Sequence, residues 1–239
     1  GPTDVVSMDM YWYTVPHCAQ EPYRSPYLVE ITRPACRSAS SYGRAVEALR
    51  IRDAADGELQ QLWHFVENLN GGPAEGTYSG YVQPGQVKGA VMSAVINEAR
   101  GILYFNQSFS GDCQSSNVFR ASQMDPGFCG GAQVQAVGEV NRQIHELAPV
   151  INTQSYDYSF GPGLDTMLKV KGEHAYVFAM LEGGSQTGGR NFKLPPGVSS
   201  AEIEVLFENR FLAAGPGGTF EDTFEHEYSF HIYRFPLDG

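Results

Sequence analysis

The 239-residue sequence is poor in positive charge and has no long hydrophobic run. It carries 16 lysine and arginine residues against 27 aspartate and glutamate residues, which gives a net charge of -11. Nucleic-acid binding depends on positive charges that replace the counterions of the phosphates, so we expect neither DNA nor RNA as a partner. No apolar run approaches the roughly 18 residues of a membrane-spanning helix, so we expect no membrane partner either.

Several catalytic and cofactor motifs are also missing. The sequence has no G-x-S-x-G nucleophile elbow and no catalytic cysteine with a matched histidine. The glycine-rich stretch 183–189 lacks the Lys-Ser/Thr pair of a phosphate-binding loop and is typical of a hairpin turn. His226 and His231 have an odd separation, so a strand would place them on opposite faces, away from a shared metal. We therefore predict neither a metal site nor a cofactor.

Four cysteines form two pairs along the chain, Cys18 with Cys36 and Cys113 with Cys129. A zinc site would favour pairs about two to four residues apart, whereas 17 residues separate the first pair and 15 the second. We predict one disulfide within each pair. Four buried free thiols are the alternative. Disulfides imply an oxidising compartment, so we expect the protein to be secreted or extracellular.

The first 150 residues alternate between apolar runs and helical stripes. Three runs rich in β-branched and aromatic residues predict buried strands, at residues 4–13, 59–67 and 101–109. Apolar residues recur at helical spacing in three other segments, which begin near Ser41, Val87 and Val137. We expect the first helix to stop at Gly57 and the last at Pro149. Such alternation predicts parallel strands with right-handed crossovers.

After about Asn152 the pattern changes to short alternating runs separated by glycine- and proline-rich turns. In one such run we expect Ile203, Val205 and Phe207 to face one way and the intervening glutamates the other. These runs predict an antiparallel β-sandwich. The predicted fold class is therefore α/β plus all-β, with residues 1–150 as an α/β domain and residues 151–239 as the sandwich domain.

Polar and aromatic residues gather where the predicted strands end, which is where parallel α/β units bind ligands. The residues in question are Asp9, Tyr11, Tyr13, Trp63, Glu67, Asn68, Tyr104, Asn106 and Gln107. Glu67 is the strongest candidate, because an unpaired carboxylate at the end of a buried strand costs several kcal/mol. We interpret it as an acid, base or nucleophile in a cleft walled by aromatic rings, which stack on sugar faces.

Structural roles are the alternatives for the same residues. Glu67 would then be a solvated or loop-capping residue just past its strand. Asp9 would be a hydrogen-bond acceptor for neighbouring strands. His64 lies on the strand face opposite to Glu67, so we predict a structural histidine there.

The succession DVVSMDMYWY, LWHFVEN and ARGILYFNQSF, followed by VNRQIHELAPVIN and an all-β tail ending in HIYRF, resembles the C-terminal portion of (β/α)8-barrel glycoside hydrolases. It is most similar to secreted bacterial proteins, with relatives in phage tails, in which a clan-A-like TIM barrel precedes a β-sandwich. The resemblance implies that Glu67 is the nucleophile that ends the seventh strand of retaining enzymes. It also implies that Asp9, Tyr11 and Tyr13 end the sixth strand and residues 104–107 the eighth, lining the sugar cleft.

The sequence departs from that family because it holds only about strands six to eight. Three strand–helix units cannot close a barrel of about eight, and the general acid of such enzymes follows the missing fourth strand. We therefore expect the N-terminal half of the barrel to be supplied in cis or by another chain. The first hypothesis is part of a retaining glycoside hydrolase acting on a polysaccharide or cell-surface glycan.

Two other hypotheses stay open at this point. One is a non-catalytic glycan-binding or phage-tail adhesion module, which would be associated with a virion. The other is a structural domain in which the polar strand ends merely satisfy one another.

Overall fold

The structure is a computed structural model that describes residues 4–16, 18, 31, 35–71, 80–196, 198 and 202–237. The chain divides into two compact units, residues 1–140 and residues 141–239, and the division falls inside one long helix, α4 (Gly131–Ile151). The predicted domain boundary after residue 150 lies near the C-terminal end of the same helix. No helix in the described part of the chain is long and apolar enough to cross a membrane.

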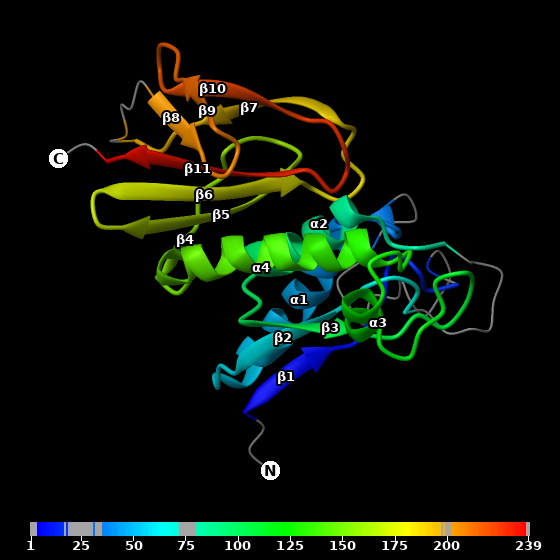
Figure 1. Ribbon diagram of the computed structural model, residues 1–239. Helices are drawn as coiled ribbons and strands as arrows, with labels where there is room; N and C mark the ends of the chain where they lie inside the picture. The colour runs from blue at the N-terminus through cyan, green and yellow to red at the C-terminus, as the bar shows by residue number, and fades with distance from the viewer. Residues whose placement is uncertain are drawn as a thin grey trace. The chain divides into compact units, whose positions relative to one another are not determined.

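The first unit is built on a three-stranded parallel sheet in the order β1–β2–β3 (Figure 1). Its strands are β1 (Val5–Met8), β2 (Gln61–Glu67) and β3 (Gly101–Phe105). Its helices are α1 (Ser40–Asp53) with the 3-10 helix η2 (Ala54–Asp56), α2 (Pro84–Ile96), α3 (Val118–Met124) and the first half of α4. The predicted alternation of parallel strands and helices is confirmed, and α3 is an additional helix. Gly57 has a φ of 82° and ends the first helical segment as expected.

One face of this sheet packs against α1 and α2. Leu62 of β2, with Val6 and Ile102 from the neighbouring strands, forms a cluster with Val46 of α1 and Ala94 of α2. These strand residues alternate along each strand with those of the opposite face of the sheet.

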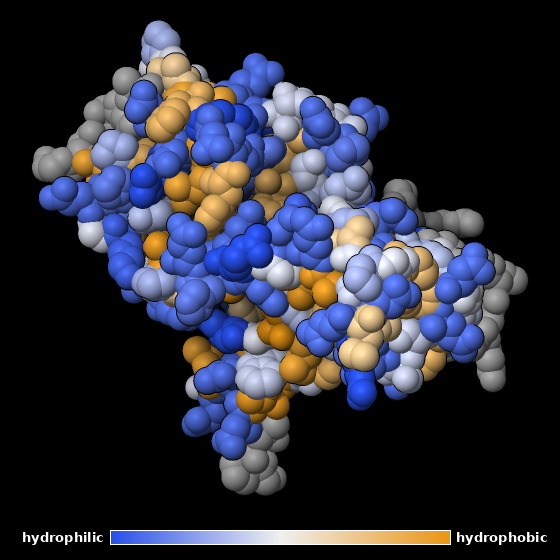
Figure 2. Space-filling model, in the orientation of Figure 1, coloured by the Kyte–Doolittle hydropathy of each residue, from blue (hydrophilic) through white to orange (hydrophobic). Residues whose placement is uncertain are grey.

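The opposite face, which we call the open sheet face, is lined by Trp63, Phe65, Leu103 and Phe105, all partly exposed. Gly101 lies beside Trp63 in the parallel register, and a Cβ atom there would lie only 2.6 Å from the Trp63 ring. A glycine is therefore needed for the indole to lie flat on β3. Figure 2 shows apolar atoms at the surface over the region of β1–β3.

β1 is shorter than the sequence predicts. It ends at Met8 rather than at Tyr13, because the carbonyl of Tyr11 accepts hydrogen bonds from the backbone N–H groups of Thr14 (3.0 Å) and Val15 (2.8 Å). These bonds close a turn, so the two-residue alternation of side chains does not continue past Met8.

α4 continues through Pro149, where the sequence predicts its end. The proline lies in the last turn of the helix, so its ring removes only one hydrogen bond near the end. The next turn still closes, since the N–H of Asn152 donates to the carbonyl of Ala148 at 3.1 Å. The Nζ of Lys171 donates to the Pro149 carbonyl at 3.1 Å.

Both predicted disulfides are confirmed. Cys18 is bonded to Cys36 with 5.8 Å between Cα atoms, and Cys113 to Cys129 with 5.7 Å. Each bond closes one local loop of the first unit. Disulfides are compatible with an oxidising, extracellular compartment.

The second unit consists of antiparallel strands, as predicted, and none of its described residues after α4 forms a helix. One sheet has six strands in the order β4–β5–β6–β11–β8–β9, and the other pairs β10 with β7. The strands are β4 (Ser155–Tyr156), β5 (Leu164–Lys171), β6 (His174–Leu181), β7 (Gly188–Lys193), β8 (Glu202–Val205), β9 (Arg210–Ala213), β10 (Thr219–Phe224) and β11 (Phe230–Pro236).

Aromatic side chains join the two sheets of this unit. Phe192 of β7 stacks on Phe220 of β10 with ring centroids 4.6 Å apart, and both rings meet the edge of Tyr233 on β11 at 5.1 Å. These residues belong to one buried cluster that draws on both sheets.

Phe207 does not share the buried face of Ile203 and Val205, contrary to the sequence interpretation. β8 ends at Val205, and the N–H of Glu208 donates back to the Val205 carbonyl at 3.3 Å. The resulting turn places Phe207 at a φ of 67° with 41% of its surface exposed. The strand pattern thus ends two residues earlier than the alternation suggests.

A charged network also links the two sheets of the second unit. Arg210 of β9 donates two hydrogen bonds to Asp222 of β10, at 2.9 and 2.7 Å, and one to Glu208 at 2.7 Å. The Tyr233 hydroxyl donates to Asp222 at 2.9 Å. Burial opposes ionisation of Asp222, but the hydrogen bonds from Arg210, the Thr223 N–H and Tyr233, together with the nearby His231, outweigh it and lower the pKa of this carboxyl. The network is therefore strongest when Asp222 is charged.

We expect Asp222→Asn to lower the free energy of unfolding by about 2 kcal/mol at pH 7, because Arg210 and Tyr233 lose their charged acceptor. The folded pKa lies below the ordinary 3.8, so this contribution is complete above about pH 5 and is lost as pH falls through the folded value. Thermal unfolding between pH 7 and pH 2 measures it. Glu221→Gln, which changes an exposed carboxyl on the same strand, is the control and should behave as wild type.

Candidate functional site

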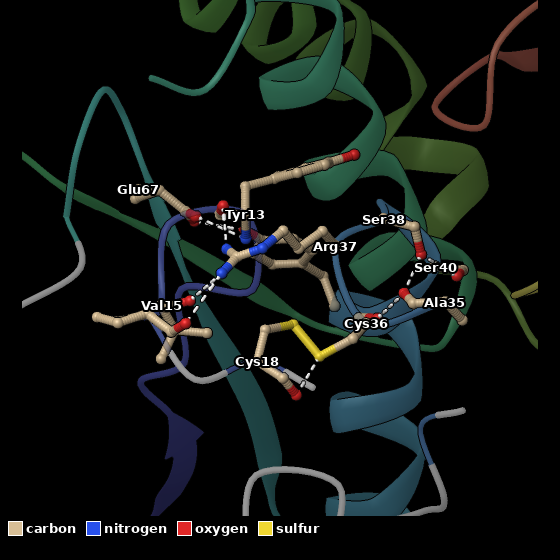
Figure 3. The surroundings of a disulfide bond; sticks show 12 residues. Tyr13, Val15, Cys18, Ala35, Cys36, Arg37, Ser38, Ser40 and Glu67 are labelled. Carbon is tan, nitrogen blue, oxygen red and sulfur yellow. Dashed lines mark hydrogen bonds between the residues drawn. A yellow bond between two sulfur atoms is a disulfide. The ribbon is translucent and has the colours of Figure 1, made fainter. Parts of the chain in front are cut away.

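The Glu67 side chain lies at the C-terminal end of β2 and is fully buried. Its Oε2 accepts a hydrogen bond from the Tyr42 hydroxyl of α1 at 2.5 Å. Its Oε1 accepts from the backbone N–H of Tyr13 at 3.1 Å and from the Thr14 hydroxyl at 3.4 Å. One helix and one turn therefore supply three donors to a single carboxyl group. Figure 3 shows Glu67 facing the backbone of Tyr13.

Burial controls the ionisation of Glu67. Removal from water raises its pKa to about 7, and the hydrogen bonds from Tyr42, Tyr13 and Thr14 offset only part of that effect. Near neutral pH the group is therefore divided between its protonated and ionised forms. Such a pKa suits proton transfer at neutral pH, whereas a nucleophile needs the ionised form, which prevails above pH 7.

The turn that covers Glu67 is held from its other side by Arg37. The guanidinium donates to the carbonyl oxygens of Tyr13 and Val15, both at 2.7 Å, and to that of Pro16 at 3.2 Å. Arg37 follows Cys36, so a disulfide adjoins this contact (Figure 3).

Three aromatic rings lie in a row beside Glu67. The Tyr11 ring lies 4.9 Å from that of Phe105, which lies 5.5 Å from that of Phe109. We call Tyr11, Phe105 and Phe109 the aromatic row. A Cβ atom on Gly71 would lie 2.8 Å from the Glu67 Cβ and 3.0 Å from the Phe105 ring, so only glycine fits there. The row and the carboxyl thus share one end of the sheet.

Tyr11 brings a hydroxyl group to this row. The hydroxyl is buried and lies beside the Asp9 carboxylate. Burial raises the Tyr11 pKa, and the nearby carboxylates of Asp9 and Glu67 raise it further. The hydroxyl therefore stays protonated at neutral pH.

The residues predicted on β3 do not gather at Glu67. The parallel register pairs Glu67 with Phe105 and Val66 with Tyr104, so Tyr104 lies on the opposite face and its ring packs against Phe119 at 6.1 Å. Asn106 caps the start of α3: its Oδ1 accepts from the N–H of Phe119 at 2.9 Å, and its Nδ2 donates to Asn117 at 2.7 Å.

The other predicted residues fall in three environments. Gln107 and Asp9 are exposed, and Tyr13 is buried with its ring 5.6 Å from that of Tyr42. Trp63 lies on the same face of the sheet as Glu67. Asn68 is fully buried, and neither of its amide atoms has a partner among the described residues. The structure therefore brings Tyr11 and Tyr13 to Glu67, while the ligand-binding roles of all these residues stay predictions.

His64 lies on the helix-covered face and fits the structural role expected from the sequence. Burial lowers its pKa to about 4, so the ring is neutral at pH 7. Its Nδ1 lies 2.7 Å from the Met8 carbonyl and donates to it. Within the described residues no group of three or more potential ligands could hold a metal ion.

Three residues at this end of the sheet were not singled out from the sequence, Arg37, Tyr42 and Phe109, and Phe105 was included only as part of the range 104–107. Tyr42 carried only a helical core signal, and Arg37 lay in a loop without periodicity. Phe105 would follow from strand alternation once the register of β2 with β3 is known, but the register itself is not encoded in either strand alone.

No protein-family model and no curated protein matches this sequence. Solved structures match the structure of the chain. AmyP in complex with maltose matches with a TM-score of 0.52 and 10% identity, over 87% of this chain and 50% of AmyP. A variant of AmyP in complex with maltotriose matches with a TM-score of 0.51 and 10% identity, over 75% of this chain and 42% of the variant. An Anoxybacillus α-amylase matches with a TM-score of 0.48 and 12% identity, over 87% of this chain and 47% of the amylase.

The fold of the chain is similar to that of the matched part of AmyP. The chain spans half or less of the length of the structures it matches. At this level of identity the similarity concerns the fold, and the site rests on the geometry described above.

Glu67→Gln should remove a pH-dependent part of the stability of the first unit. The folded pKa of about 7 lies above the ordinary 4.5, so the stabilising contribution of the protonated group is complete below about pH 4.5 and is lost as pH rises through 7. Between pH 4 and pH 8, the free energy of unfolding of wild type should fall by about 3 kcal/mol relative to the variant.

Urea unfolding followed by tryptophan fluorescence measures this difference, because both tryptophans, Trp12 and Trp63, lie in the first unit. Glu58→Gln, at an exposed glutamate of the same unit, is the control. Parallel pH profiles for wild type and Glu67→Gln would contradict the expectation.

Proposed function

We propose that the chain is part of a carbohydrate-active protein whose glycan lies against the aromatic row beside Glu67. The row carries this proposal, because Tyr11, Phe105 and Phe109 follow or end parallel strands at the edge where α/β folds bind ligands. Aromatic rings stack on the apolar faces of sugars. The AmyP structures hold maltose and maltotriose, which supports a carbohydrate as the ligand class.

The catalytic form of this proposal is a retaining glycoside hydrolase with Glu67 as nucleophile. Retention needs a second carboxyl group about 5 Å away, which acts as the general acid. Among the described residues, backbone N–H groups and the hydroxyls of Tyr42 and Thr14 hydrogen-bond to Glu67, so we propose that the general acid comes from the segment that completes the barrel. The expected substrate is a polysaccharide or a cell-surface glycan.

The open sheet face supports a partner segment that completes the barrel, in cis or from another chain. Parallel sheets are normally covered on both faces, yet Trp63, Phe65, Leu103 and Phe105 are partly exposed. Within the described residues, β1 and β3 each pair on one side only. Additional parallel strands would bury these side chains and pair both edges.

Complete burial of Glu67 favours a second candidate, a non-catalytic glycan-binding or adhesion module that is extracellular or associated with a virion. A sugar cannot reach a carboxyl with no exposed surface while the turn formed by Tyr11–Val15 lies over it. The aromatic row would bind the glycan in this candidate as well, so turnover alone distinguishes the two.

In the protein with its complete barrel, Glu67→Gln should leave glycan binding nearly unchanged and reduce hydrolysis by at least about 1000-fold, because the amide keeps the shape and loses the nucleophile. Hydrolysis and binding of a panel of polysaccharides by wild type, Glu67→Gln and the control Glu58→Gln measure both effects. Binding without hydrolysis by wild type would establish the second candidate and remove the first.

Phe109→Ala should weaken glycan binding by about 1 kcal/mol, roughly fivefold in Kd, because this ring is the most exposed of the aromatic row. Isothermal titration with the glycan that binds best is the measurement. Phe211→Ala is the matched control, since it removes a ring of 59% exposure from the second unit. Equal losses in both variants would contradict a binding role for the row.

A further inference from the structure

We propose that Arg37 is a positioning residue that holds the Tyr11–Pro16 turn over Glu67, and that the Cys18–Cys36 disulfide fixes Arg37 in that position. We call Arg37, this turn and the disulfide the clamp. The closed clamp separates Glu67 from solvent and from any ligand. As a form of regulation this inference rests on the proposed function, but the coupling between clamp and Glu67 is measurable without a glycan.

The first link in the argument is between the turn and Glu67. The backbone N–H of Tyr13 and the hydroxyl of Thr14 both donate to the Glu67 Oε1. The turn is closed internally, because the N–H groups of Thr14 and Val15 share the Tyr11 carbonyl. Tyr13 and Thr14 are buried, so this short segment covers the carboxyl as a unit.

The second link is between the turn and Arg37. The guanidinium group reaches the carbonyl oxygens of Tyr13, Val15 and Pro16, so it spans the outer side of the same turn. Only arginine presents several donors in one rigid plane, whereas a lysine ammonium is a single point charge. Figure 3 shows the guanidinium between the turn and the disulfide.

The third link is covalent. Cys36 precedes Arg37, and its partner Cys18 lies two residues beyond Pro16, so the disulfide joins the donor segment to the segment that it grips. The Ser38 and Ser41 hydroxyls both donate to the Ala35 carbonyl, at 2.5 and 2.7 Å, which fixes the entry to α1.

The same helix carries Tyr42, the third donor to Glu67. Residues 36–42 therefore provide the disulfide, the guanidinium and a direct hydrogen bond. An opening of the clamp would change the environment of Glu67 from two sides, the turn and α1.

An opened clamp would expose the Glu67 carboxyl. Burial is the largest cause of its raised pKa, so exposure should lower the pKa from about 7 toward the ordinary 4.5, even though hydrogen bonds are lost. Among the described residues, the titratable groups that face Glu67 are the Tyr42 hydroxyl on α1 and the Tyr11 hydroxyl on the turn, and both remain neutral over this range. The shift would therefore report on the clamp itself.

The first experiment compares wild type with Arg37→Gln and with Arg44→Gln, a matched change at a surface ion pair on α1. Carboxyl groups are labelled with a water-soluble carbodiimide and glycine amide, and labelling of Glu67 is read by peptide mass spectrometry. We expect labelling of Glu67 to rise at least tenfold in Arg37→Gln and to stay at the wild-type level in Arg44→Gln. Labelling of buried Asp222 and the near-ultraviolet circular dichroism report on general unfolding.

The second measurement is the pKa of Glu67 by carbon-13 NMR, with Glu67→Gln to assign the signal. Arg37→Gln should lower the pKa of Glu67 by about 1 to 2. If Arg37→Gln does not fold, Arg37→Lys takes its place, because it keeps the positive charge and loses the planar group with several hydrogen-bond donors. A folded variant with wild-type labelling and an unchanged pKa would overturn the role of Arg37.

The disulfide is tested by the double variant Cys18→Ser/Cys36→Ser, with Cys113→Ser/Cys129→Ser as the matched control. Only the first should increase labelling of Glu67, and equal effects of the two would overturn the role assigned to Cys18–Cys36. Increased labelling together with an absence of glycan binding would uphold the clamp and reject the proposed function. Glycan turnover by wild type, together with wild-type labelling of Glu67 in the variants, would uphold the proposed function and reject the clamp.

Discussion

A carboxyl group without exposed surface stands at the centre of the first unit, and several elements are arranged so that it has hydrogen-bond donors. β2 places Glu67 at the end of the sheet, α1 supplies the Tyr42 hydroxyl, and the turn after β1 supplies Tyr13 and Thr14. An unpaired charge in this position would cost several kcal/mol. The short β1, the tight turn and the start of α1 can all be understood as conditions for this one group.

Much of the backbone could be predicted from the sequence. Alternation of apolar strands with helical stripes indicated the parallel sheet, and loops rich in turn residues around each cysteine pair indicated the two disulfides. The errors lie at ends of elements. Hydrogen bonds to Tyr11 end β1 early, and a proline in a last turn does not end α4, because only one bond is lost.

The candidate site was predicted less completely, for a physical reason. Glu67 stood out because a carboxylate after a buried strand needs an explanation. Its neighbours depend on the register between strands, which places Phe105 and not Tyr104 beside it. Its donors come from a turn and a helix whose local patterns indicate only structure. Contacts between distant segments are therefore the part that a single sequence does not reveal.

The open sheet face has a consequence for handling the isolated chain. Its partly exposed rings adjoin two strands that each have an unpaired edge among the described residues, and such edges are templates for pairing with other chains. Copies of the chain would compete with the proposed partner segment for the same edges. The net charge of -11 opposes that contact by mutual repulsion, so self-association should grow as added salt screens the charge.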